Sequence, residues 1–348
     1  MTRPPSKALI CENSTTRSSS HSTLNLSSDT VDNHKLLVYY QNVRSILSVS
    51  KFQNFCTSIS LCTNKPDIIV LTETWLENDQ YDAYYVIDGY TTYRTDRSGD
   101  TSVKQSGGGC LIAVSNQLIS SPIILRNRGV EQLFVKISNK ATKFIVGTAY
   151  LSHGCTIDHY AAHVETVESL ATRFSSFKML LVGDYNLTGV YWPTDRILSY
   201  DVSNAANRDI IDKAILLGNS FGTLDLTQLH PVLVSDKGYS LDLCFSNFDN
   251  VNFVKPLELL SKVDLHHPPS SFIISGIAKE TLKVKEKFRN FRKANYEGIN
   301  ANLAAIDCHS SFAGLDCESK AVKLQEILNN EINKHVPLIN KKPNDYPS

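Results

Sequence analysis

The stretch MLLVGDYNLTGVYW, residues 179–192, begins as a continuous apolar run and then turns abruptly polar. Its opening MLLV is typical of a strand that is buried on both faces. An ordinary turn would normally follow, but here the run leads into Gly183, Asp184 and Asn186. An Asx turn would account for this polar pair. The alternative is that a rigid buried strand holds the carboxylate and the amide for binding or catalysis.

Short apolar or alternating runs recur along the chain on both sides of this stretch. Each has strand length and is bounded by Gly, Asn, Asp, Ser or Pro: LLVYY, DIIVLTE, GCLIAVS, LFVKI, KFIVGTAYL, MLLVGD, SLDLCFS and SFIIS. Helical patterns lie between some of them, with apolar residues every three or four positions over 157–174 and a second helix over 207–218. Many strands with few intervening helices favour a layered α/β or α+β sandwich over residues 35–277.

The two ends of the chain differ in composition from this central region. Residues 1–34 are rich in Ser and Thr and lack apolar periodicity, so we expect them to be disordered. Residues 279–293 are rich in Lys and Arg, and the later SKAVKLQEILNNEINKHV is typical of a helix. Lys285 and Arg289 are therefore candidates for phosphate contacts, although such a segment is more often a solvated helix face.

Composition and charge argue against several classes of protein. The 348 residues are 42% hydrophobic, and 35 Lys and Arg balance 35 Asp and Glu, so no global positive charge indicates nucleic-acid binding. The 8 Cys show neither CxxC pairs nor Cys/His ligand spacing, which predicts neither a zinc site nor a disulfide framework. We expect no membrane span and no secretory signal, because no sufficiently long apolar run occurs.

Polar side chains suited to a divalent cation or a phosphate recur at the predicted strand ends. They are Asn42, Glu73, Tyr150, Asp184, Asn186, Asp242, Asp264, His266 and His267. Each alone has an ordinary explanation, such as a solvated carboxylate, a rim aromatic or a loop. In a layered fold, however, strand ends that converge on one edge form a natural ligand site. Carboxylate oxygens there would suit Mg²⁺ or Mn²⁺.

The order of these segments resembles the endonuclease/exonuclease/phosphatase superfamily, and within it the apurinic-type endonuclease domain of non-LTR retrotransposons. The matching segments are YYQNVRSI, PDIIVLTETWL, YRTDRS, SGGGCLIAVS, FIVGTAYL, MLLVGDYNL, YSLDLCFS and VDLHHPP. The resemblance implies a four-layer α/β/β/α sandwich of two packed mixed sheets flanked by helices. FRNFRKANYEGINANL and NDYPS resemble the connector before a reverse transcriptase, so residues 278–348 would be a basic helical connector truncated before that polymerase.

The resemblance also implies hydrolysis of a phosphodiester with Mg²⁺ or Mn²⁺, here the nicking of double-stranded DNA for retrotransposition. Glu73 would be the principal metal ligand, with Asn42 beside it. Asp184 would orient or deprotonate the attacking water, and Asn186 would hold the phosphate or that water. Tyr150 would donate a hydrogen bond to the scissile phosphate.

The His and its acidic partner depart from the family pattern. Asp242 resembles the family's strand Asp near the metal and the His. The family's terminal Asp and His are adjacent, whereas one residue separates Asp264 from His266 and two separate it from His267. A variant Asp-x-x-His-Pro spacing favours Asp264 with His267, and His266 is the second choice. His230, in the segment TQLHPVLV, is a candidate substrate-binding residue that would face DNA. Relatives usually carry Asn at this position, which leaves the DNA-facing role of the loop open.

Two further functions fit the sequence. The displaced His and the missing polymerase motivate a catalytically degenerate or domesticated remnant that binds nucleic acid or a partner without cutting. A phospholipid or inositol-phosphate phosphodiesterase could use the same scaffold, but LTETWL and GGGCLIAVS favour the DNA enzyme. Arg97 would either form a surface ion pair or lie near the DNA backbone. A chromosomal target implies the nucleus, although no strong nuclear signal is visible.

Overall fold

The described part of the computed structural model comprises residues 35–77, 85–102, 104, 106–125, 129–138, 142–194, 198–231, 239–277 and 287–340. The predicted disorder of residues 1–34 and the predicted phosphate contact of Lys285 lie outside these residues.

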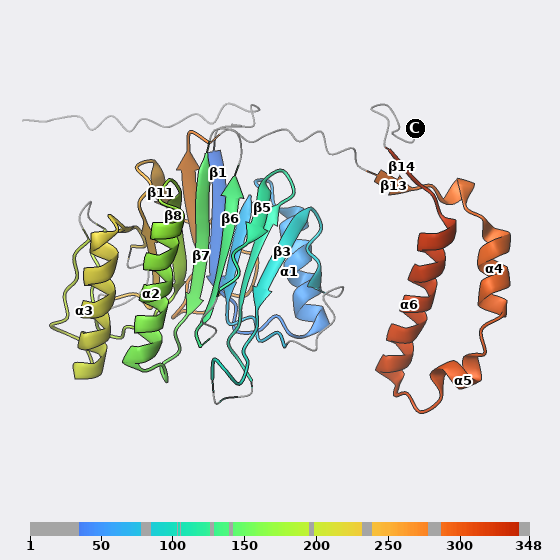
Figure 1. Ribbon diagram of the computed structural model, residues 1–348, viewed down its shortest axis with the longest axis horizontal. Coiled ribbons are helices and arrows are strands. Elements are labelled where there is room, and N and C mark those ends of the chain that lie inside the picture. Colours follow the sequence, from blue (N-terminus) through green and yellow to red (C-terminus); the bar gives the residue numbers. More distant parts are fainter. Residues whose placement is uncertain are drawn as a thin grey trace, which may run out of the picture. The chain divides into compact units, whose positions relative to one another are not determined.

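Two six-stranded sheets face each other in residues 35–277 (Figure 1). The first has the order β11-β12-β1-β2-β4-β3 and contains β1 (Lys35–Asn42), β2 (Ile68–Thr72), β3 (Tyr90–Thr95), β4 (Cys110–Ser115), β11 (Val251–Val254) and β12 (Ser270–Ser275). The second has the order β5-β6-β7-β8-β10-β9 and contains β5 (Ile119–Pro122), β6 (Glu131–Ser138), β7 (Lys143–Tyr150), β8 (Lys178–Asp184), β9 (Thr227–Gln228) and β10 (Asp242–Ser246). Both sheets are mixed, because β1 pairs with β2 and β7 with β8 in parallel while the other pairs are antiparallel.

Helices cover the outer faces of both sheets, which confirms the predicted four-layer sandwich. The helix α1 (Val49–Leu61) begins at Ser48, whose Oγ accepts a hydrogen bond from the Lys51 amide, and it packs Phe52 and Phe55 with residues of the first sheet. The second sheet is covered by α2 (Ile157–Arg173) and α3 (Arg208–Thr223), close to the two helices predicted from the sequence (Figure 1).

The main core lies between the sheets. It contains many branched side chains that alternate along the strands, including Val38, Val70, Ile112, Val146 and Val182, which are fully buried. Complete burial of one such side chain stabilises the fold by about 1.5–3 kcal/mol. The sandwich therefore provides a rigid frame for the polar groups at its strand ends.

The strand directions bring the predicted polar side chains to one edge. The carboxyl ends of the parallel pair β1 and β2 carry Asn42 and Glu73, and those of β7 and β8 carry Tyr150 and Asp184. The antiparallel strand β10 begins at the same edge, where Asp242 is the register partner of Asp184. The abrupt polar end of the MLLVGDYN stretch is explained by this convergence.

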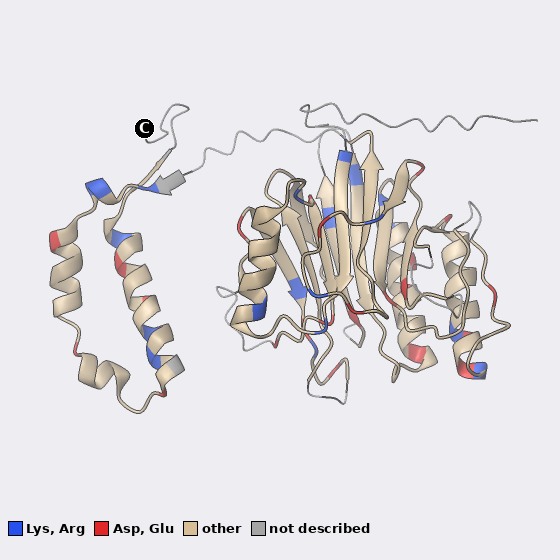
Figure 2. Cartoon of the chain, turned by 180° about the vertical axis from the view of Figure 1, so that it is seen from behind, with Lys and Arg blue, Asp and Glu red and all other residues tan. Residues whose placement is uncertain are grey.

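Residues 287–340 form a separate helical segment closed by a short ladder. The strands β13 (Lys287–Arg289) and β14 (Leu338–Asn340) pair antiparallel, and between them lie η2 (Phe291–Lys293), α4 (Tyr296–Ala304), α5 (Cys308–Phe312) and α6 (Cys317–His335). The predicted helix in SKAVKLQEILNNEINKHV is thus present as α6. Figure 2 shows acidic and basic residues mixed along α6, where Lys323 Nζ lies 3.7 Å from Glu326 Oε2. Within the described ranges, no helix is both long and apolar enough to cross a membrane.

Candidate active site

Asn42 and Glu73 connect the first sheet to the second. The Asn42 side-chain amide donates to Glu73 Oε1 at 3.0 Å and to Asp184 Oδ2 at 3.1 Å. Glu73 has a φ of +54°, and its carbonyl accepts a hydrogen bond from the Ser45 amide at 2.8 Å. A non-glycine residue in this left-handed conformation costs about 1–2 kcal/mol, so the surrounding structure must hold Glu73 in place.

The two buried aspartates lie on adjacent strands of the second sheet. Asp184 is 1% exposed and Asp242 is 0% exposed. The Tyr40 hydroxyl donates a hydrogen bond to Asp242 Oδ1 at 2.6 Å, and the Asn186 backbone amide donates one to Asp184 Oδ1 at 3.2 Å. This second contact is the Asx-type turn considered above, and it occurs within the site. Burial, followed by the Asp242 and Glu73 carboxylates, raises the pKa of Asp184 well above its ordinary value, although His267 opposes the shift.

His267 is the imidazole that reaches this pair. Its Nδ1 lies 3.0 Å from Asp242 Oδ2 and 3.9 Å from Asp184 Oδ2. Burial lowers the pKa of His267, but the neighbouring carboxylate of Asp242, with those of Asp184 and Glu73, outweighs this effect and raises the pKa to about 9. The imidazole is therefore mainly protonated at neutral pH.

The predicted pairing of the Asp264 carboxylate with His267 is wrong. Asp264 Oδ2 lies 2.8 Å from Arg44 Nε, and its Oδ1 accepts a hydrogen bond from the His266 amide. The Asp264 carbonyl accepts a hydrogen bond from the His267 backbone amide at 3.1 Å. The tight turn between Asp264 and His267 directs their side chains to different partners, and Asp242 orients the imidazole instead. His266 is exposed, so His267 is the residue at the site.

Tyr150 and Arg97 lie next to each other near Glu73. The Arg97 guanidinium is 5.8 Å from the centroid of the Tyr150 ring. Burial, followed by the nearby Glu73 and Asp184 carboxylates, raises the pKa of Tyr150, which keeps its hydroxyl protonated as a donor. Arg97 forms an ion pair, as one alternative predicted, but the pair is buried: its Nε is 2.7 Å from Glu131 Oε1, and its Nη1 donates to the Ser106 carbonyl.

Glu131 was not identified by sequence reasoning. Its carboxylate accepts hydrogen bonds from Arg97 and, at 2.6 Å, from the Gly109 amide. Burial raises the pKa of Glu131, while the Gly109 amide and Arg97 partly offset the shift. A Glu before the apolar run LFVKI is normally solvated. In the sequence, only the triple glycine 107–109 could have indicated that a buried side chain contacts this loop.

Asn186 has one unsatisfied side-chain atom. Its φ is +48°, and its Nδ2 donates to the Leu151 carbonyl at 3.0 Å. Its Oδ1 is buried and has no hydrogen-bond partner among the described residues. A buried acceptor without a partner costs about 1–3 kcal/mol, so this atom is available for a ligand or water at the site.

His230 does not join this cluster, and the contacts of Arg289 lie within residues 287–340. The expectation that His230 faces DNA is wrong, because its ring is fully buried against Phe253 and Phe272, its Nε2 contacts Ser270 Oγ, and burial lowers its pKa. Arg289 donates to the carbonyls of Ile332 and Val336, at the carboxyl end of α6. This contact caps a helix.

The donor set fits a divalent cation. Asp184, Asp242 and His267 each present one possible ligand atom, and these atoms all lie within 4.8 Å of one another. Glu73 places a further carboxylate beside this group, because the Asn42 side-chain nitrogen donates to both Glu73 Oε1 and Asp184 Oδ2. Burial, followed by the Asp242 and Glu73 carboxylates, raises the pKa of Asp184 even though His267 opposes the shift, and a hard dication would further offset the repulsion between these carboxylates.

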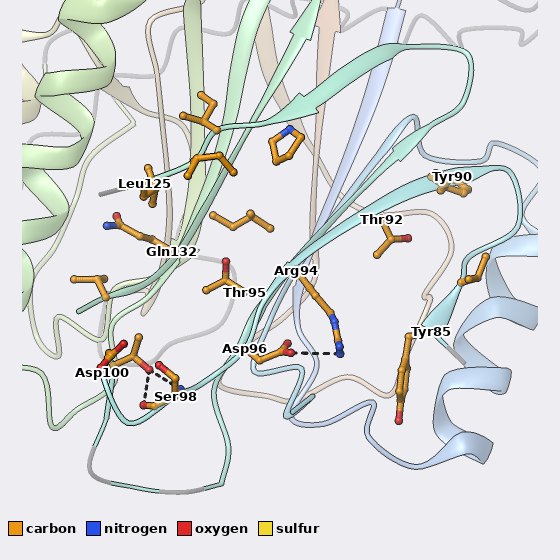
Figure 3. Close-up of a pocket in the computed structure, with 17 residues that line it drawn as sticks. Tyr85, Tyr90, Thr92, Arg94, Thr95, Asp96, Ser98, Asp100, Leu125 and Gln132 are labelled. Atoms are coloured by element: carbon orange, nitrogen blue, oxygen red, sulfur yellow. Dashed lines mark hydrogen bonds and ion pairs between the residues drawn. The ribbon is translucent and has the colours of Figure 1, made fainter. Parts of the chain in front are cut away.

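A cavity of about 820 Å³ lies beside β3 and β6, away from this cluster (Figure 3). Arg94 and Asp96 form an ion pair at 3.4 Å in its wall, where Thr92 and Gln132 also lie. None of the predicted catalytic or metal-binding residues is among the described residues that line it. The cavity is therefore distinct from the candidate active site.

Comparisons with known proteins identify the family and support the fold. The sequence matches the Endonuclease/Exonuclease/phosphatase family over residues 23–264. No curated protein matches the chain. Among solved structures, the AP endonuclease LMAP from Leishmania major has a TM-score of 0.51 at 12% identity, with 70% of this chain and 88% of that chain covered. The endonuclease domain of TRAS1, a telomere-specific non-LTR retrotransposon, has a TM-score of 0.49 at 15% identity, with 70% and 99% covered. At this identity, the likeness to LMAP shows the fold.

Proposed function

The chain belongs to the endonuclease/exonuclease/phosphatase family, and we propose that it is a Mg²⁺-dependent DNA endonuclease that nicks target DNA for retrotransposition. The observation that supports the proposal best is the pairing of His267 with Asp242 beside Asp184, at the edge where both sheets end. An acid, a base and metal-ligating oxygens are thereby held together by rigid strands.

Members of this family are metal-dependent phosphodiester hydrolases. In this chain, Glu73 and Asn42 would hold Mg²⁺ or Mn²⁺, and the adjacent buried carboxylates complete an oxygen-rich set. When bound, the ion supplies positive charge for the nonbridging oxygens of the phosphate. Asn186 Oδ1, which has no partner among the described residues, would hold the phosphate-bound water or the attacking water.

The protein's own side chains would manage the protons. Asp184 would accept the proton of the attacking water or orient it, a role that its position beside Asp242 and His267 supports. His267, kept protonated by Asp242, would donate to the negative charge that develops on the phosphate. Tyr150, whose raised pKa keeps its hydroxyl protonated, would donate a second hydrogen bond to the same group.

The DNA substrate and the role in retrotransposition rest on the resemblance of the motifs LTETWL and GGGCLIAVS to retrotransposon endonucleases. On this proposal, the protein acts in the nucleus, and a reverse transcriptase is its partner in the full-length element. The contact between His267 and Asp242 counts against a catalytically degenerate remnant, because the altered spacing still brings an imidazole to a buried carboxylate.

Nicking of supercoiled plasmid by the purified protein tests the proposal. We expect nicking with Mg²⁺ and none with EDTA, and a loss of at least about a hundredfold in Glu73→Ala, because a principal metal ligand is removed. Glu77→Ala is the matched control, since Glu77 is an exposed carboxylate further along the same loop. It should retain activity.

The other outcomes distinguish the alternatives. A folded protein that binds DNA but does not nick it with Mg²⁺ or Mn²⁺ would favour the remnant. Metal-dependent hydrolysis of phospholipid or inositol-phosphate micelles, without nicking of DNA, would favour a phosphodiesterase of small phosphoesters. Equal activity in Glu73→Ala and wild type would contradict the assignment of the metal site.

A further inference from the structure

Trp75 is an aromatic side chain at the active-site edge with no part in the chemistry described above. Its side chain is 38% exposed, whereas Trp192, the second of the two Trp residues, is 2% exposed and packs against Phe245. Among the described residues, no other aromatic ring packs against the Trp75 indole. A large apolar surface is therefore presented beside the cluster of carboxylates.

The backbone holds this ring in an unfavourable conformation. Trp75 has a φ of +60°, and its amide donates to the Gly108 carbonyl at 2.8 Å. The left-handed conformation is rare for a bulky residue and is retained mainly where the surroundings enforce it. The triple glycine 107–109 lies against this ring, since a Cβ at Gly107 would be in ordinary contact with the indole nitrogen at 3.8 Å.

The indole is also fixed to the candidate metal ligand. Its Nε1 donates to Glu73 Oε2 at 3.3 Å, so the ring lies directly beside the position proposed for the scissile phosphate. In a nucleic acid, the bases next to that phosphate are the nearest flat apolar groups. Stacking of a base on an aromatic ring contributes affinity without sequence specificity, since every base has a π face.

We propose that Trp75 is a substrate-binding residue on which a nucleobase next to the scissile phosphate stacks. This inference rests on the proposed DNA endonuclease function and adds a reason for nucleic acid as the substrate. The triple glycine then has a function as well, as the support that presents the ring.

Intrinsic fluorescence tests the stacking directly, since only the exposed Trp should respond to DNA. The wild-type protein is titrated with an unlabelled DNA duplex in EDTA, so that no cleavage occurs. The variant Trp75→Phe supplies the fluorescence spectrum of Trp192 alone. We expect saturable quenching in the wild type and none in Trp75→Phe. Binding is measured in parallel by the anisotropy of a labelled duplex.

Two substitutions separate stacking from support of Glu73. Trp75→Phe keeps an aromatic face but removes the Nε1 donor, whereas Trp75→Leu removes both. We expect Phe to bind DNA close to wild type and Leu to bind roughly ten- to a hundredfold more weakly. The dependence of affinity on salt should keep its slope in both variants, because the ring neutralises no phosphate.

Three results would overturn the inference. Binding shown by anisotropy without fluorescence quenching would place Trp75 outside the DNA interface while leaving the proposed endonuclease intact. Equal weakening in the Phe and Leu variants would make the Nε1 contact with Glu73 the function of Trp75. Flat anisotropy in the wild type would remove the DNA substrate, and the proposed function would fail together with the stacking.

Discussion

His267 depends on a neighbour that is remote in the sequence. The imidazole meets Asp242 at 3.0 Å, whereas Asp264, only a turn away, faces Arg44. Burial alone would favour the neutral imidazole, and the Asp242 carboxylate reverses that preference. The protonation state of His267 is therefore controlled by one residue of β10.

Asp242→Asn should lower the pKa of His267. In the metal-free wild type we expect the imidazole to remain protonated through neutral pH and to lose its proton near pH 9. In the variant, burial is no longer offset by Asp242, so the pKa should fall toward or below its ordinary value of about 6.5. NMR titration of the imidazole nitrogens measures both values.

Asp264→Asn is the matched control for this titration. It removes a carboxylate that is closer in the sequence but that pairs with Arg44, so the pKa of His267 should change little. A large fall in this variant, or an unchanged pKa in Asp242→Asn, would contradict the assignment of Asp242 as the partner. Because His267 binds its proton more tightly when folded, its contribution to stability is present below about pH 6.5 and is lost as pH rises through 9.

The sequence was sufficient to predict which residues converge but not which side chains pair. The strand ends carrying Asn42, Glu73 and Asp184 were predictable, because apolar runs locate strands and a layered fold brings their ends together. Side-chain pairing depends on register and turn direction, which one sequence does not reveal. Asp264 was therefore assigned to the wrong partner, and His230 was not recognised as a buried core residue.

At the scale of secondary-structure elements, the loop 106–109 holds the site residues in place through hydrogen bonds. All three glycines 107–109 have positive φ, and the loop accepts amide donors from the Glu73–Trp75 turn while donating to Glu131. The edge strands β3 and β5 were not predicted from the sequence, because YTTYRT and ISSP are half-exposed and form no apolar run. Buried elements were predicted more accurately than those at edges.

Gly108→Ala should destabilise the protein more than an ordinary glycine substitution. The residue has a φ of +67°, and a Cβ would overlap Glu131 Oε2 and lie 2.6 Å from Arg97 Nη2. We therefore expect loss of both the favoured backbone conformation and the buried ion pair, about 3 kcal/mol or more in the free energy of unfolding. Urea denaturation measures it from the transition midpoint.

Gly89→Ala isolates the backbone part of this effect. Gly89 has a φ of +82°, but a Cβ there would meet nothing within 4 Å. The expected loss is only about 1 kcal/mol, from the left-handed conformation alone. Similar losses for the two variants would mean that the packing of Glu131 against the glycine loop contributes little.

At the scale of the whole molecule, the site crosses the interface between the two sheets. Asn42 and Glu73 belong to the first sheet or follow it, and Asp184 and Asp242 belong to the second. Hydrogen bonds from Asn42 to Asp184 and from Tyr40 to Asp242 join them. The buried carboxylates oppose this association unless a cation or protons neutralise them, so function and stability are in conflict at this edge.

Mg²⁺ should therefore stabilise the fold. The variant Asp184→Asn should show that the buried Asp184 carboxylate serves function at the expense of stability. At about a hundred times its dissociation constant, an ion bound only to the native state contributes about 2.7 kcal/mol, or roughly 5–10 °C in the thermal midpoint. The metal-free variant should be at least as stable as wild type, because it removes the buried Asp184 carboxylate from beside Asp242, and it should lose most of the Mg²⁺ response. Thermal denaturation with and without Mg²⁺ measures both effects, and Glu77→Ala should retain the full response. A metal-free variant that is clearly less stable than wild type would show that Asp184 stabilises the fold through its hydrogen bonds rather than opposing it through its charge.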